Sequence, residues 1–132
     1  MKDILFLIGS ESDKENVKPG IDLINEKKLT HELYVYSAHR NLDELCAFLQ
    51  QREQDFKVII AAAGLSAALP GVVAAKVKKP VIGIPLAAGV LNGIDALLSI
   101  IQLPKGIPVA TMGIGKQGVL NAIHLAERII NA

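Results

Sequence analysis

The sequence predicts a three-layer α/β fold, a doubly wound parallel sheet of five strands with helices on both faces. Two observations support this prediction. Short apolar runs lack polar alternation, as expected of strands that are buried on both faces of a parallel sheet. Segments with apolar residues at helical spacing separate these runs in strict alternation. The chain has 132 residues, of which 51% are apolar, so we expect a single domain over residues 1–132.

The five expected strands are apolar runs that are too short to form helices of their own. They cover residues 4–8, 33–36, 58–63, 81–84 and 109–112.

The first helix is expected directly after the first strand. Ser12 and Glu15 have the spacing of a capping box, which marks a helix start. Pro19 and Gly20 fall inside the pattern, so either the helix kinks there or Pro19 opens it at its first position. Three apolar residues keep helical spacing across this pair, namely Val17, Ile21 and Ile24. Their spacing favours the kinked helix.

Three later segments carry apolar residues on one helical face. These are Leu42, Leu45, Cys46 and Leu49, then Ile94, Leu97, Leu98 and Ile101, and finally Val119, Ile123, Ala126 and Ile130. Asn41 with Glu44 fits a looser capping box before the first of these segments, and Asn92 precedes the second. With one more helix between the third and fourth strands, five helices alternate with five strands.

For five parallel strands with right-handed crossovers, we expect the flavodoxin-like order 2-1-3-4-5. Ligands of such sheets bind beyond the carboxyl ends of the strands, where the strand order reverses. This point lies between the first and third strands. The loops after Ile8, Tyr36 and Ala63 should therefore surround the functional site.

The loop after the first strand reads Gly9-Ser10-Glu11-Ser12-Asp13. Its two hydroxyls precede a helix, where free amides and the helix dipole favour an anion, and Asp13 can accept hydrogen bonds from ribose hydroxyls. Simple helix capping uses the same residue types, so both interpretations stay open. The loop is neither a dinucleotide fingerprint nor a P-loop, because the spaced glycines and the Gly-Lys-Ser/Thr sequence are absent.

The loop after the second strand reads Ser37-Ala38-His39-Arg40. An imidazole has an ordinary pKa of about 6.5, which suits His39 to proton transfer near neutral pH. Arg40 can hold a phosphate through two parallel hydrogen bonds. A histidine next to an arginine at this strand end indicates a functional role.

The loop after the third strand, residues 64–71, holds small residues and no charge. Such a loop lets backbone amides face a ligand, although close packing between helices or subunits needs the same residue types. Together the three loops offer hydroxyls, a carboxylate, an imidazole, a guanidinium and bare backbone. This set suits a phosphorylated ribose compound and a single proton transfer.

Composition argues against several other classes of protein. The 14 basic and 13 acidic residues give a formal net charge of +1, which argues against nucleic acid and anionic membranes as partners. Cys46 is the only cysteine, so it forms neither an internal disulfide nor a multi-cysteine metal site. No apolar run fits a signal peptide or a transmembrane helix. We therefore expect a cytoplasmic protein that uses no metal and no cofactor.

Taken together and in order, several motifs resemble the PurE family of N5-carboxyaminoimidazole ribonucleotide mutases. They are Gly9-Ser10-x-Ser12-Asp13, Ser37-Ala38-His39-Arg40, Leu69-Pro70-Gly71, and the stretches 79–85, 93–97 and 102–111. The resemblance covers nearly the whole chain. It implies a flavodoxin-like subunit of a homo-octamer, which moves a carboxylate from the exocyclic nitrogen to C4 of an aminoimidazole ribonucleotide without a cofactor.

The resemblance also implies a role for each matching residue. His39 would be the general acid and base. Ser10, Ser12 and Arg40 would hold the phosphate, and Asp13 would hold the ribose. The pocket for the aminoimidazole and its carboxylate would be lined by Ser37, Ala38, Gly64, Leu65, Ser66 and Leu69.

The chain departs from the family pattern at a few positions. Ala68 stands where mutases commonly carry a histidine before Leu-Pro-Gly, and Leu65 and Ser66 replace smaller residues. The chain also stops at Ala132 without the C-terminal extension of many bacterial members. Besides an active mutase, these departures leave open a carboxylase that uses carbon dioxide directly and a non-catalytic ribonucleotide-binding paralogue. Arg40, rather than lysine, resembles the mutase class.

Two classes of the same topology fit less well. A receiver domain needs a phosphate-accepting aspartate at the end of the third strand, where residues 61–63 are all alanine. Flavodoxins usually stack aromatic residues on the flavin, and this chain has no tryptophan and two tyrosines.

Two weakly charged segments, residues 74–93 and 86–101, are too apolar for free exposure to solvent. Their composition predicts burial between subunits of a homo-oligomer.

Overall fold

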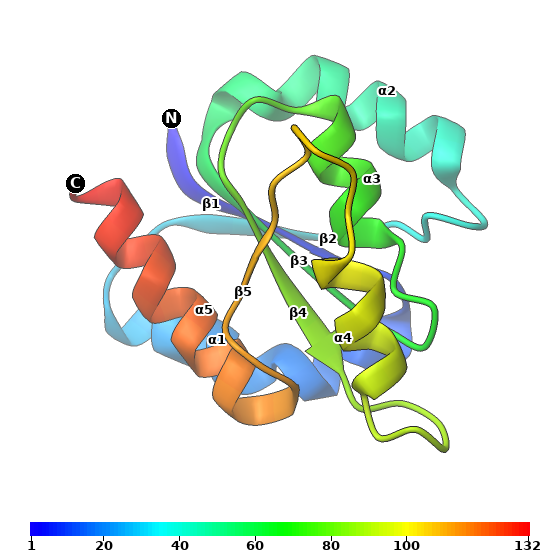
Figure 1. The fold of residues 1–132 in the computed structure, drawn as a ribbon. Coiled ribbons are helices and arrows are strands. Elements are labelled where there is room, and N and C mark those ends of the chain that lie inside the picture. The colour runs from blue at the N-terminus through cyan, green and yellow to red at the C-terminus, as the bar shows by residue number, and fades with distance from the viewer.

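A computed structural model describes residues 1–132 and contains one parallel sheet of five strands (Figure 1). The strands are β1 (Lys2–Ile8), β2 (His31–Val35), β3 (Phe56–Gly64), β4 (Val81–Leu86) and β5 (Ala110–Thr111). The α-helices are α1 (Lys14–Glu26), α2 (Leu42–Arg52), α3 (Leu69–Lys76), α4 (Ile94–Ile101) and α5 (Gly115–Ile130), and the short 3₁₀ turns are η1 (Glu11–Asp13) and η2 (Glu53–Asp55). The sheet order is β2-β1-β3-β4-β5, which confirms the predicted flavodoxin-like fold. None of the helices has both the length and the apolar character needed to cross a lipid bilayer.

The helices form layers on both faces of the sheet, with α1 and α5 on one face and α2, α3 and α4 on the other (Figure 1). Successive side chains of a strand point to opposite faces. Ile4, Phe6 and Ile8 of β1 accordingly pack with α1 and α5, whereas Leu5 and Leu7 pack with the other helices. All five side chains are fully buried. This two-sided burial explains why the strand carries no polar alternation.

The two edge strands differ from their predicted ranges. Strand β2 begins at His31 rather than Leu33 and ends before Tyr36, and all of its residues are half-buried. Strand β5 covers only Ala110 and Thr111, because these are the only residues that pair with β4. An edge strand has a neighbour on one side only, so apolar composition alone does not mark where its pairing stops.

Helix α1 continues through Pro19 from Lys14 to Glu26, so Pro19 does not open the helix. Gly20 faces Val119 and Ile123 of α5. A Cβ atom added to Gly20 would lie only 2.7 Å from Cγ1 of Val119. The glycine therefore allows the two helices to pack closely on the same face of the sheet.

The predicted capping box of Ser12 and Glu15 is wrong. Ser12 lies within the turn η1, and its backbone amide donates to the hydroxyl oxygen of Ser10 at 3.3 Å. Ser10 therefore caps the turn that precedes α1. The α-helix itself starts with no side-chain hydrogen bond at its N-cap, Asp13.

The later helix starts also differ in detail from the capping pattern. Asn41 is the N-cap of α2, yet its side chain makes no hydrogen bond to that helix. Helix α4 begins after Gly93, which has a φ of +91°, and not after Asn92. The left-handed conformation at the start of α4 favours glycine.

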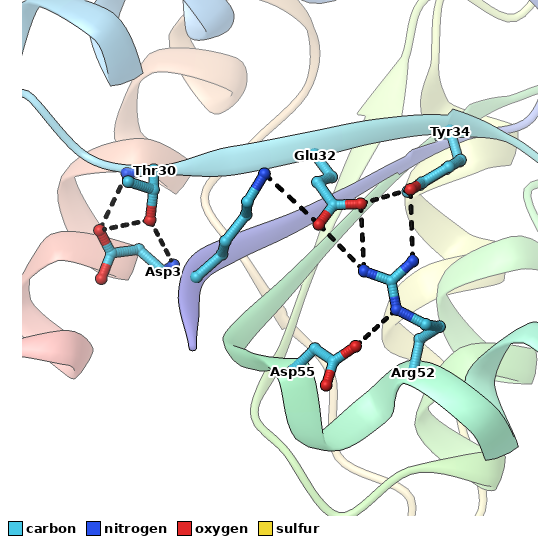
Figure 2. Close-up of polar contacts among 7 residues, drawn as sticks. Asp3, Thr30, Glu32, Tyr34, Arg52 and Asp55 are labelled. Carbon is cyan, nitrogen blue, oxygen red and sulfur yellow. Dashed lines mark hydrogen bonds and ion pairs between the residues drawn. The ribbon is translucent and has the colours of Figure 1, made fainter.

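A cluster of polar side chains joins β2 to the end of α2 (Figure 2). The Arg52 guanidinium donates to both carboxylate oxygens of Glu32, at 3.0 and 3.2 Å, and to Asp55. The Tyr34 hydroxyl also donates to Glu32 and is the main cause that lowers the pKa of this carboxyl. Glu32 lies near the start of β2. The cluster therefore holds this edge strand at its amino end, which is opposite the carboxyl ends of the strands.

Candidate active site

A cleft of about 780 Å³ opens at the carboxyl edge of the sheet, where the strand order reverses. Its walls come from the loops after β1, β2 and β3, together with Ala88 after β4. Every residue to which the sequence analysis gave a role lines this cleft: Ser10, Ser12, Asp13, Ser37, Ala38, His39, Arg40, Gly64, Leu65, Ser66 and Leu69. The fold therefore brings together three segments that are far apart in the sequence.

A second cleft, of about 610 Å³, lies between the end of α3 and the segment before β5. Three lysines contribute to it, Lys76, Lys78 and Lys79. Its lining includes no histidine, carboxylate or hydroxyl group. The cleft at the strand ends is therefore the better candidate for acid–base chemistry.

The loop after β1 presents two exposed serine hydroxyls to the cleft. The hydroxyl oxygens of Ser10 and Ser12 lie 2.9 Å apart and share a hydrogen bond. Glu11, next to them, pairs with Lys14 at 2.8 Å. The two hydroxyls precede α1 and can turn together toward an anion, because a hydroxyl hydrogen rotates freely.

Asp13 closes this loop and is half-buried at the edge of the cleft. Burial raises the pKa of its carboxyl, and a hydrogen bond with Ser10 partly opposes this shift. A Cβ atom added to Gly9 would meet the Asp13 carboxylate at 4.0 Å and Ala63 at 3.6 Å, which are ordinary contacts. Packing within the protein therefore does not require a glycine here, and its missing side chain leaves room in the cleft.

The loop after β2 is organised around Ser37. The hydroxyl oxygen of Ser37 accepts hydrogen bonds from the backbone amides of His39, at 3.3 Å, and Arg40, at 3.1 Å. Both of these side chains are exposed and line the cleft. Ser37 therefore shapes the loop that carries the imidazole and the guanidinium.

The loop after β3 packs closely against the loop after β4. A Cβ atom added to Gly64 would lie 2.8 Å from that of Ala88, and one added to Gly89 would lie 2.7 Å from Leu65. Leu65 itself has a φ of +56° and a side chain that is 54% exposed. Leu69, by contrast, is only 2% exposed and packs in the core. This wall of the cleft is apolar and built closely on backbone.

The structure adds lining residues that the sequence analysis did not place in the site. Asn41 was treated only as a helix cap, and Ala88 carried no signal because its loop follows the fourth strand. The charged groups of the cleft are Glu11, Asp13 and Arg40, so one cation faces two carboxylates. An anionic ligand would therefore depend on Arg40 and on local amides rather than on a broad basic surface.

The fold and the cleft together define a doubly wound α/β protein with a candidate small-molecule site at its topological switch point. Within this class, a family model described as AIR carboxylase matches residues 3–132. The chain belongs to the AIR carboxylase family, which confirms the resemblance to PurE proteins.

Similar proteins cover almost all of this chain. The N5-carboxyaminoimidazole ribonucleotide mutase of Bacillus subtilis is 48% identical over 128 residues, which are 96% of this chain and 79% of that protein. The mutase of Escherichia coli K12 is 41% identical over 128 residues, or 96% of this chain and 76% of that protein. The crystal structure of Treponema denticola PurE superposes with a TM-score of 0.85 at 28% identity and covers 97% of this chain and 79% of that chain.

Proposed function

We propose that this chain is an isomerase that converts N5-carboxyaminoimidazole ribonucleotide into 4-carboxy-5-aminoimidazole ribonucleotide, a step of purine biosynthesis. The main support is that His39 and Arg40 line the same cleft as the Ser10–Asp13 loop, in a chain that is 48% identical to the N5-carboxyaminoimidazole ribonucleotide mutase of Bacillus subtilis.

In this proposal, the parts of the cleft divide the substrate between them. Arg40 holds the phosphate with the hydroxyls of Ser10 and Ser12, because a guanidinium stays charged and can donate two parallel hydrogen bonds. The carboxylate of Asp13 accepts from the ribose hydroxyls. The aminoimidazole and its carboxylate lie against a wall formed by Ser37, Ala38, Gly64, Leu65, Ser66 and Leu69.

His39 then supplies both proton transfers of the reaction. Carbon dioxide leaves when the bond from the exocyclic nitrogen to the carboxyl carbon breaks, and the nitrogen takes a proton from the imidazolium. C4 then forms a bond to the same carbon dioxide and loses its hydrogen to the neutral imidazole. The proton count balances over the cycle, so one histidine is sufficient. The apolar wall near Leu65 helps to retain carbon dioxide between the two steps.

The direct test is turnover of N5-carboxyaminoimidazole ribonucleotide by the purified protein, followed by product absorbance. We expect His39→Asn to lower turnover by about two to four orders of magnitude, as for a lost general acid and base. His124→Asn is the matched control, because this exposed histidine on α5 does not line the cleft. The proposal fails if the wild-type protein gives no product or if His39→Asn remains fully active.

A second candidate activity is direct carboxylation of aminoimidazole ribonucleotide by carbon dioxide. Two observations favour it. The matching family is described as AIR carboxylase, and Ala68 lines the cleft where the resemblance leads us to expect a histidine. The two activities separate when each substrate is supplied alone. Product from aminoimidazole ribonucleotide and bicarbonate, with none from the carboxyamino compound, would favour the carboxylase. Thermal stabilisation by ribonucleotide without any product would favour a non-catalytic binding protein.

We also propose that the protein is a homo-oligomer, an octamer by resemblance. The support is an exposed apolar surface on and before α4, at the end of the molecule where the loop after β4 protrudes (Figure 1). It consists of Val90, Leu91, Ile94, Leu98 and Ile101. On α4 these residues have helical spacing on one face, which is typical of a helix that packs against a partner. A mass of 14.1 kDa in light scattering would contradict the proposal.

The remaining proposals concern the whole chain. Residues 1–132 act as a single PurE-like domain, because one sheet supports both core clusters. We place the protein in the cytoplasm, because a phosphorylated ribonucleotide does not cross membranes unaided. The proposed chemistry needs only an imidazole and bound carbon dioxide, so it uses neither a metal nor a cofactor.

A further inference from the structure

Asn41 closes the loop that carries His39 and Arg40. Its backbone amide donates to the carbonyl oxygen of Ser37 at 2.8 Å. In the opposite direction, the Ser37 amide donates to the side-chain oxygen Oδ1 of Asn41 at 3.3 Å. These two hydrogen bonds join the first and last residues of the loop, so its ends are held together.

The side chain of Asn41 does not make the hydrogen bond that is usual for a helix N-cap. An asparagine at a helix N-cap normally accepts a hydrogen bond from an amide of the first helical turn. Asn41 makes no such bond to α2, although its carbonyl oxygen accepts from Leu45 and so begins the helix. Its amide oxygen serves the loop instead of the helix.

His39 and Arg40 depend on this closure for their position. Both side chains are exposed, and their backbone amides donate only to the Ser37 hydroxyl oxygen. Their side chains make no hydrogen bond or ion pair to other protein groups. The orientation of Ser37 therefore sets where both groups enter the cleft, and Asn41 holds Ser37 from the other end of the loop.

We propose that Asn41 is a positioning residue of the active site, which holds the Ser37–Asn41 loop closed so that His39 and Arg40 face the substrate together. The expected changes in kcat and KM rest on the proposed function, because they require turnover of the proposed substrate. A loosened loop would misplace the proton-transfer group and the phosphate-binding group at once. The result would be a lower kcat and a higher KM.

The test compares Asn41→Leu, Asn41→Asp and the control Asn25→Leu in the full chain. Leucine removes the accepting oxygen at nearly the same size, whereas aspartate keeps it. Asn25 is exposed at the end of α1 and does not line the cleft. Loss of one hydrogen bond predicts a decrease of about three- to tenfold in kcat/KM for Asn41→Leu, with both kcat and KM changed. We expect wild-type kinetics for the control. Asn41→Asp should have a kcat closer to that of the wild type than Asn41→Leu has, because aspartate keeps the accepting oxygen, while its added charge beside Arg40 raises KM for an anionic substrate.

Each outcome bears on the proposal. A decrease in kcat alone, with an unchanged KM and a lowered melting temperature, would mean that fewer molecules are folded and would overturn it. Wild-type kinetics for Asn41→Leu, or equal losses of kcat for the leucine and aspartate variants, would overturn it as well.

A readout without turnover separates this inference from the proposed activity. The ring signal of His39 in a ¹H–¹³C spectrum, assigned with His39→Asn, should shift or broaden in Asn41→Leu and stay in place in Asn25→Leu. If the wild type gives no product, the proposed function fails, and this signal still decides whether Asn41 positions His39. An unchanged signal in Asn41→Leu would then refute the inference.

Discussion

Gly118 in the first turns of α5 allows no side chain at all. A Cβ atom built on it would lie 1.8 Å from the carbonyl oxygen of Gly113 and 2.6 Å from its carbonyl carbon. Both contacts are with backbone, so no side-chain rotation relieves them. We therefore expect Gly118→Ala to destabilise the fold strongly.

The cost follows from what would have to move. The contact must open from 1.8 Å to at least 3.0 Å, which displaces either α5 or the segment before it. Helix α5 cannot retreat without opening the core, because four of its side chains are fully buried: Val119, Ala122, Ile123 and Ala126. Overpacking of this kind costs about 3 kcal/mol, at the upper end of its usual range. For a chain of this length, the melting temperature should fall by about 10 °C.

The measurement is thermal and urea unfolding followed by circular dichroism, with Gly71→Ala as the matched control. Gly71 also lies in a helix, but its added Cβ would meet the flexible end of the Leu103 side chain, at 2.9 Å. That side chain can move aside, and alanine favours a helix over glycine by up to about 1 kcal/mol. Gly71→Ala should therefore change stability by no more than about 1 kcal/mol. Equal melting temperatures for the two variants would refute the reasoning from backbone contact.

Two further predictions concern the start of β1 and the exposed apolar surface of α4. The hydrogen bond that the Thr30 amide donates to Asp3 (Figure 2) is the main cause that lowers the pKa of this carboxyl. Lys57 lowers it further. A carboxylate whose pKa is lowered by folding stabilises fully above its unfolded pKa of about 3.9, and this contribution is lost as the pH falls through the folded value. At pH 7, Asp3→Ala should therefore have a lower melting temperature than the wild type. In melting curves recorded over a series of pH values, the difference in melting temperature should narrow below about pH 4, and a constant difference would contradict this. Leu98→Glu places a charge on the exposed face of α4 and should shift the oligomer to smaller species in light scattering, whereas an unchanged mass would place the contact elsewhere.

Much of the fold could be predicted from local patterns alone. Runs such as 4–8 and 58–63 are apolar at every position because both faces of the sheet are covered. This pattern predicts buried strands without a structure. The limits of the edge strands could not be predicted in this way, because β5 exists only where two residues pair with β4. The hydrogen-bond partners at the helix starts could not be predicted either, since Ser12 and Asn41 each had more than one possible partner within reach.

For the candidate site, residue types and their spacing were enough to predict the chemical groups and the strand ends that carry them. The packing of the folded chain was needed to show that the hydroxyl of Ser37 holds the backbone of His39 and Arg40, and that Asn41 bonds to the loop rather than to the helix. It also brought Ala88 into the cleft and exposed one apolar face of α4. The physical reason is that residue type and spacing set what a side chain can bind. Which of several partners it does bind depends on distances of a few tenths of an ångström, and only the packed fold determines these.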